Sequence, residues 1–234
     1  MQYYDLMVTQ GWGLALITAA LMTLAVSVTA LCLGAVLGSL IAWAKLGGST
    51  AMKVFADGYT TVLRGIPDLL VIYLFYFGGS SVLGQIGRLF GYDGFIGLPA
   101  FATGAIAVSI VNAAYQAEVY RGAYLAISKG ELEAARAVGM HRLLMFRRII
   151  VPQALRFAIP GLGNCWQIVL KESALISVTG LVELLRQAQV GSGSTRQPFY
   201  FYMTAAALYL VLTTISTWGF ERVETYANRG VRRA

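Results

Sequence analysis

Uninterrupted apolar runs dominate this sequence and limit what it can fold into. The run from 13 to 44 contains no charged residue. A helix needs about 20 mostly apolar residues to cross a bilayer. Because this run is longer than that, we expect a membrane helix that tilts or projects from one face. Five segments meet the length requirement, and the sequence predicts five membrane-spanning helices at 13–44, 62–87, 99–120, 149–170 and 199–220.

The predicted fold is therefore an all-α integral membrane helical bundle, formed by residues 1–234 as a single domain. The composition agrees, since 57% of the residues are hydrophobic and 12% are charged, about half the charged share of a soluble domain. The apolar segment 173–185 is too short to cross a bilayer. We expect it to form a re-entrant or surface helix.

The 18 Lys and Arg residues are unevenly divided among the gaps between these runs. Fourteen of them lie in the gaps 45–64 and 121–156 and in the tail after residue 220. Cytoplasmic loops are enriched in Lys and Arg, so we expect an outside N-terminus, a cytoplasmic C-terminus and a cytoplasmic 121–156 gap. The basic residues in these segments account for most of the positive charge behind the net charge of +7. We expect membrane lipid to surround the chain, and we expect the chain to bind no nucleic acid.

The longest charged stretch, GELEAARAVGMHRLLMFRRIIVP, occupies 130–152. Ser128 is a candidate N-cap, and Glu131 three residues later would complete a capping box. Gly139 predicts a break between two short helices. On periodicity alone, an amphipathic helix lying on the bilayer surface is an equally good interpretation.

The residues of this stretch also carry a recognisable signature. They resemble the "EAA...G.........I.LP" signature of the membrane permease subunits of ABC importers, with Val151 where the signature favours Leu. The matching positions are Glu133, Ala134, Ala135, Gly139, Ile149 and Pro152. Three further segments resemble the HisQ-like branch of that family, which serves polar amino acids and opines; these are LRGIPDLL (63–70), AEVYRGAY (117–124) and LKESALIS (170–177).

The resemblance implies a type I ABC importer transmembrane domain in a bacterial inner membrane. The 128–152 loop would then be the cytoplasmic coupling loop, whose helix docks on an ATPase subunit. The substrate would be a polar, cationic amino acid of the histidine, arginine, lysine or ornithine type, or an opine, translocated by ATP-driven alternating access. The implied partners are a second related permease subunit, an ATPase subunit dimer and an extracytoplasmic substrate-binding protein.

The sequence contains no recognisable motif for catalysis or nucleotide binding. No G-x-x-x-x-G-K-[ST] motif is present, so this chain lacks the usual phosphate loop for ATP. We therefore expect that this chain is not an enzyme and binds no cofactor. ATP and Mg would bind to the partner ATPase. The single histidine, His141, has no second ligand nearby in the sequence, and we predict no metal site and no catalytic residue. An ATP-independent secondary transporter or channel stays open as the alternative, although it would need no docking loop.

Polar residues inside the apolar runs are candidates for the substrate path, because such groups tend to face a watery route through the membrane. The alternative is that Asn and Gln side chains bond neighbouring helices. Helical spacing also permits same-face pairs of Glu118 with Arg121 and of Arg64 with Asp68. The predicted substrate-path residues are Asn112, Asn164, Gln167 and Glu172.

Overall fold

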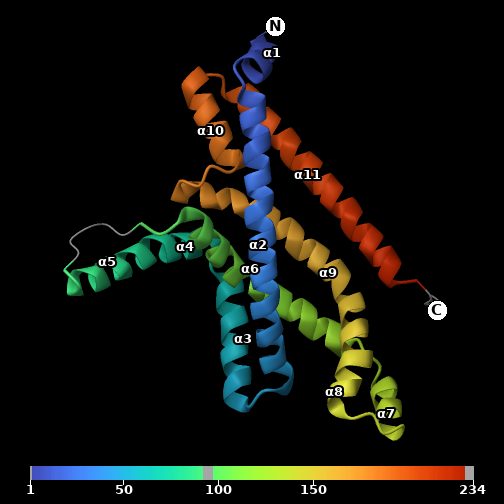
Figure 1. Cartoon of the computed structure of the whole chain (residues 1–234). Helices are drawn as coiled ribbons and strands as arrows, with labels where there is room; N and C mark the ends of the chain where they lie inside the picture. The colour runs from blue at the N-terminus through green and yellow to red at the C-terminus, as the bar shows by residue number, and fades with distance from the viewer. Residues whose placement is uncertain (1, 92–96, 230–234) are drawn as a thin grey trace.

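The structure, a computed structural model, describes residues 2–91 and 97–229. Every regular element in these ranges is helical, which confirms the predicted fold class (Figure 1). The N-terminal half contains α1 (Gln2–Tyr4), η1 (Asp5–Thr9), α2 (Trp12–Gly47), α3 (Thr50–Gly65), α4 (Asp68–Tyr73), η2 (Leu74–Gly78) and α5 (Gly79–Leu89). The C-terminal half contains α6 (Ala100–Leu125), α7 (Lys129–Ala137), α8 (Arg142–Met145), η3 (Phe146–Ile150), α9 (Val151–Glu172), η4 (Ser173–Thr179), α10 (Leu184–Thr195) and α11 (Pro198–Ala227).

Within the described residues, four helices are long and apolar enough to cross a membrane. The fourth predicted segment, 149–170, does form a helix, α9, but is not among them. Arg156 lies inside α9 and Lys171 lies in its last turn, which lowers its apolar character. The predicted number of five spans therefore stays a prediction. The four helices are Trp12–Gly47, Asp68–Ile86, Ala100–Leu125 and Pro198–Ala227.

The second predicted span begins later than the sequence indicated. Helix α3 ends at Gly65, and the next helix begins at Asp68. Ile66 between them has an extended backbone, with ψ of 139°, because a residue before proline is driven away from the helical region. The predicted boundary at 62 is therefore wrong, and the apolar helix starts after Pro67.

Helix α6 lies at the centre of the bundle. In its most apolar stretch of 18 residues, 67% of the residues are buried, whereas in that of α11 only 11% are buried. Helix α2 packs along α6 through two glycines. A Cβ atom at Gly38 would lie 3.0 Å from the Ala113 carbonyl oxygen, and one at Gly34 would lie 2.8 Å from the Gln116 amide nitrogen. Small residues at these positions let the two backbones approach closely, as in other membrane helix pairs.

Two apolar cores hold several other elements to this pair. The first joins α2, α4, α6, α9 and η4 through buried residues that include Val26, Ile72, Val108, Val169 and Ile176. The second lies near the N-terminus, where α10 and α11 meet α2. Figure 1 shows α1 and α10 at one end of the molecule, and the α2–α3 turn with α7 and α8 at the other.

The segment 173–185 is not the single re-entrant or surface helix that we predicted. It forms the 3₁₀ helix η4, a turn at Gly180 with φ of 86°, and the start of α10. The Glu183 side chain is fully buried, and its carboxylate accepts the backbone N–H groups of Leu185 and Arg186 at 2.8 and 2.7 Å. Burial raises the pKa of Glu183, although these N–H groups oppose the rise. Tyr209 of α11 also donates its hydroxyl to the Glu183 carboxylate at 3.2 Å, a contact across 26 positions that no local pattern predicts.

Candidate functional site

The 128–152 loop stands at the end of the molecule opposite the N-terminus (Figure 1). Helix α7 ends at Ala137, and α8 begins at Arg142. Gly139 between them has φ of 78°, a left-handed conformation that glycine adopts without the steric cost of a Cβ atom. The predicted pair of short helices with a break at Gly139 is confirmed.

The predicted capping box is wrong, although Ser128 does occupy the N-cap of α7. Its hydroxyl accepts no backbone N–H. Glu131 instead accepts a hydrogen bond from the Gln153 amide, which joins α7 to the start of α9. His141 caps α8, since its Nδ1 accepts the Leu144 backbone N–H at 3.3 Å. This cap was not predicted from the sequence, although the position of His141 after the Gly139 break could have suggested it.

The six signature residues lie on or next to this helix–turn–helix unit. Glu133 and Ala134 are exposed on α7, whereas Ala135 turns inward and is 3% exposed. Gly139 is exposed at the turn, and Ile149 is half-buried in η3. Pro152 is the second residue of α9, directly after the π-helical turn η3. A partner could therefore reach a carboxylate, a small side chain and a sharp turn together.

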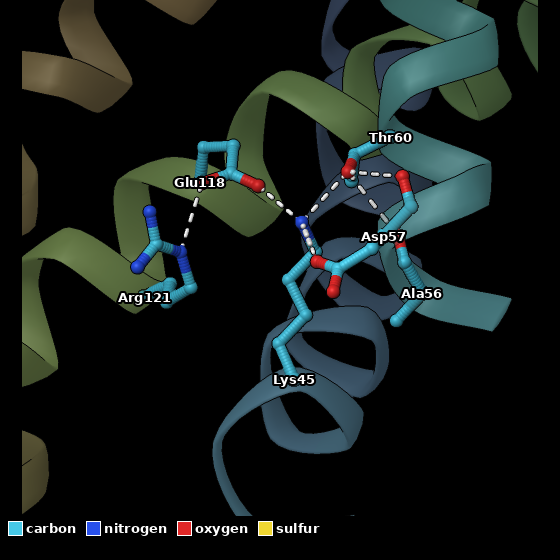
Figure 2. Close-up of polar contacts among 6 residues, drawn as sticks. All are labelled: Lys45, Ala56, Asp57, Thr60, Glu118 and Arg121. Carbon is cyan, nitrogen blue, oxygen red and sulfur yellow. Dashed lines mark hydrogen bonds and ion pairs between the residues drawn. The ribbon is translucent and has the colours of Figure 1, made fainter. Parts of the chain in front are cut away.

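A polar cluster lies beside the part of α6 that leads into this loop. The Lys45 ammonium donates to Thr60 Oγ1 at 2.7 Å, pairs with Asp57 Oδ1 at 3.0 Å and pairs with Glu118 (Figure 2). Arg121 Nε donates to the other oxygen of Glu118 at 2.9 Å, which confirms the predicted same-face pair. The Lys45 side chain is 7% exposed. The roles of Lys45, Asp57 and Thr60 were not predicted from the sequence, because no local spacing indicates a contact between Lys45 and Glu118.

The predicted Arg64–Asp68 pair is absent from the ion pairs of the described residues. The break at Pro67 separates the two residues into different helices. Arg64 instead lies over the Tyr115 ring, 5.4 Å from its centroid, at a distance typical of a cation–π contact. Arg64 also lines a cavity of about 600 Å³ beside the Lys45 cluster.

The structure does not bring the four predicted substrate-path residues together at one point. Asn112 is fully buried in α6, donates to the Cys165 carbonyl at 3.3 Å and accepts from Gln116 at 2.6 Å. Gln167 donates to Thr217 at 2.9 Å. Both side chains thus bond neighbouring helices, which is the alternative that the sequence left open. Asn164 is exposed on α9.

Glu172 differs from the other three because it is buried without a complete set of hydrogen bonds. It is 8% exposed, and its Oε2 atom has no hydrogen-bond partner within the described chain. Asp68 begins α4, a helix that packs in the same apolar core as α9. A buried carboxylate normally needs a charged or hydrogen-bonding partner. Glu172 thus offers one carboxylate oxygen that a cationic group could occupy.

Comparisons with known proteins agree with the loop signature. Residues 34–225 match the family described as "Binding-protein-dependent transport system inner membrane component". The chain belongs to this family. It is thus a membrane permease subunit of a transport system, and the predicted membrane location is confirmed.

Individual relatives match nearly the whole permease. The octopine transport system permease protein OccQ of Rhizobium meliloti is 61% identical over 223 residues, covering 95% of this chain and 94% of the relative. The histidine/lysine/arginine/ornithine transport system permease protein HisQ of Escherichia coli (strain K12) is 36% identical, covering 96% of this chain and 98% of the relative. A crystal structure of an amino acid ABC transporter with histidines superposes with a TM-score of 0.80 at 33% identity, covering 95% of this chain and 98% of that one.

Proposed function

We propose that this permease imports an opine, or a polar, cationic amino acid, as a subunit of an ABC importer that works by ATP-driven alternating access. The observation that carries the proposal is the 61% identity over 95% of the chain to a relative named for octopine transport. The relative named for histidine, lysine, arginine and ornithine supports the wider class of cationic amino acids. This subunit itself catalyses no reaction.

The partners follow from the same proposal. An ATPase subunit dimer would bind ATP and Mg, and its closure would act on the 128–152 loop. Exposed Glu133 and Ala134 beside the turn at Gly139 support a docking role, because a small side chain permits close approach and a carboxylate attracts a basic group. A second related permease subunit would complete the pathway, and an extracytoplasmic binding protein would deliver the substrate. ATP shifts the equilibrium only by binding the two states with different affinity.

The proposed orientation places the N-terminus outside and the 128–152 loop in the cytoplasm. The basic residues of the 45–64 and 121–156 gaps support it. The α2–α3 turn, which carries Lys45 and Lys53, lies at the same end of the molecule as α7 and α8 (Figure 1). Both gaps can therefore face the cytoplasm at once, as the enrichment of basic residues in cytoplasmic loops requires.

Reconstitution tests the proposal. The permease, its ATPase, its partner permease and its binding protein are placed in liposomes, and uptake of labelled octopine, arginine, histidine and ornithine is measured with and without ATP. We expect uptake that requires both ATP and the binding protein. Uptake driven by an ion gradient in the absence of ATP would instead identify an ATP-independent secondary transporter, and passive flux would identify a channel.

We also propose that Glu172 receives the cationic group of the substrate. Replacing Glu172 by glutamine should lower uptake of a cationic substrate at low concentration by roughly tenfold, because one charge-assisted hydrogen bond contributes about 1.5–3 kcal/mol. Concentration-dependent uptake by the reconstituted complex measures this effect.

The matched control is Glu221→Gln, which changes an exposed carboxylate on α11 in the same way. It should leave the concentration dependence unchanged. Equal effects of the two substitutions, or an effect of Glu172→Gln on the amount of assembled complex alone, would contradict a substrate contact at Glu172.

A further inference from the structure

The Lys45 ammonium is a single charge that ties three helices together. It lies in the last turn of α2 and contacts two residues of α3, Asp57 and Thr60, and one residue of α6, Glu118 (Figure 2). Glu118 receives Arg121 as well. The Lys45 side chain is 7% exposed and that of Glu118 is 23% exposed, so this pair is screened less than a surface pair would be, whereas Asp57 is 67% exposed.

The cluster lies on the part of α6 through which movement of the 128–152 loop would reach the bundle. Glu118 and Arg121 lie in the last two turns of α6, which ends at Leu125, and α7 begins at Lys129. The other side of the loop is joined to the bundle as well. Glu131 bonds Gln153 at the start of α9, and Arg156 Nε donates to Asn228 Oδ1 at 2.8 Å. Movement of α7 would therefore reach the bundle through α6 and α9.

Among the described residues, an open space separates much of α2 from the 128–152 loop. A cavity of about 1400 Å³ lies between them, lined by Trp43 of α2, Tyr120 of α6 and Arg136 of α7, among others. Closer to the middle of the bundle, α2 and α6 touch through Gly34 and Gly38, and the Gln116 side chain donates to the Leu31 carbonyl at 3.1 Å. The Lys45 cluster is thus the ionic connection between the α2–α3 hairpin and the loop-proximal end of α6 among the described residues.

We propose that Lys45 is a positioning residue that makes the α2–α3 hairpin move together with the end of α6 when the 128–152 loop moves. The inference rests on the proposed ATP-driven function. If α6 shifts without the hairpin, the Lys45–Glu118 pair breaks and leaves two charges imperfectly paired in a poorly solvated place, which is costly. The intact pair therefore favours joint movement over independent movement of the two parts.

Substitutions at the pair should uncouple the importer without unfolding it. Lys45→Met retains the long aliphatic stem, and Glu118 then still has Arg121. Glu118→Gln leaves Lys45 paired with Asp57. Neither change strands a buried charge without any partner. Lys53→Met is the matched control, because Lys53 is an exposed lysine of the same hairpin.

The experiment compares these variants and the double variant Lys45→Met/Glu118→Gln in the reconstituted complex. It measures the amount of assembled complex, ATP hydrolysis stimulated by the loaded binding protein, and substrate molecules imported per ATP hydrolysed. We expect assembly within about twofold of wild type. Import per ATP should fall roughly five- to tenfold in each single variant, in the range by which residues of a coupling network alter the communication between sites. Lys53→Met should match wild type.

The double variant distinguishes one joint contact from two separate roles. If the pair acts as a unit, the double variant should lose no more import per ATP than the more affected single variant. Multiplying losses would overturn the inference, as would single variants with wild-type import per ATP. If Lys45→Met does not assemble, Glu118→Gln decides alone. A wild-type complex that imports nothing with ATP would instead refute the proposed function.

Discussion

Replacing Gly38 by leucine will force α2 away from α6 and lower the amount of assembled permease by about tenfold or more. Even a Cβ atom at this position lies 3.0 Å from the Ala113 carbonyl oxygen and 3.2 Å from the Ala117 backbone nitrogen. These atoms belong to the central helix and cannot move aside like a flexible side chain. Overpacking typically costs about 1–3 kcal/mol, and each 1.4 kcal/mol is about tenfold in an equilibrium. Detergent extraction followed by size-exclusion chromatography measures the assembled fraction.

The control for this substitution is Gly219→Leu in α11. A Cβ atom at Gly219 meets no other atom within 4 Å, so the same side chain is added to a membrane helix without a clash inside this chain. It should assemble at close to the wild-type level. Normal assembly of Gly38→Leu would show that the close α2–α6 contact is not required for the fold.

Replacing Gly139 by valine should reduce ATP-driven uptake by at least about tenfold while the permease still assembles. The left-handed backbone at Gly139, with φ of 78°, costs roughly 1–2 kcal/mol for a residue with a Cβ atom, and a β-branched side chain is a marked outlier there. A Cβ atom at this position has open space around it. The cost therefore comes from the backbone, and it shifts the loop away from the shape that would dock. Uptake per assembled complex measures the effect.

A graded series makes this prediction sharper. Asparagine tolerates the left-handed region better than other side chains, so activity should decrease in the order Gly139→Asn, Gly139→Ala and Gly139→Val. Gly130→Ala is the control, since Gly130 lies within α7, where alanine favours the helix. A series without this order would contradict the requirement for the turn, and equal losses in Gly130→Ala would indicate a general sensitivity of the loop.

The sequence was most informative where local pattern decides the structure. Apolar runs correctly located α2, α6, α9 and α11, because burial in lipid requires continuous helices. The left-handed turn at Gly139 also followed from a local rule. The break at Pro67 could have been predicted in the same way, from the proline and the residue before it. It was missed because the apolar run continued on both sides.

Contacts between distant segments could not be predicted in this way. Lys45 meets Glu118 across 73 positions of sequence, and Asn112 meets the Cys165 carbonyl across 53. No periodicity encodes such a pairing, because it depends on how the helices are arranged in space. The same limit explains why Asn112 and Glu172 looked equivalent as polar residues in lipid. The structure separates them, since Asn112 satisfies its hydrogen bonds within the bundle and one Glu172 oxygen does not.

The close contact between α2 and α6 lies near a fixed point about which these helices can tilt. Gly38 touches α6 at Ala113 and Ala117, near the middle of that helix, while Asn112 fastens the same region to α9. From Ala113 to the end of α6 at Leu125, the rise of 1.5 Å per residue gives an arm of about 18 Å. A tilt of about 10° of α6 together with α2, relative to α9, would displace the far end of α6 by about 3 Å. A rigid helix that is held near its centre thus converts a small displacement of one end into an opposite displacement of the other end.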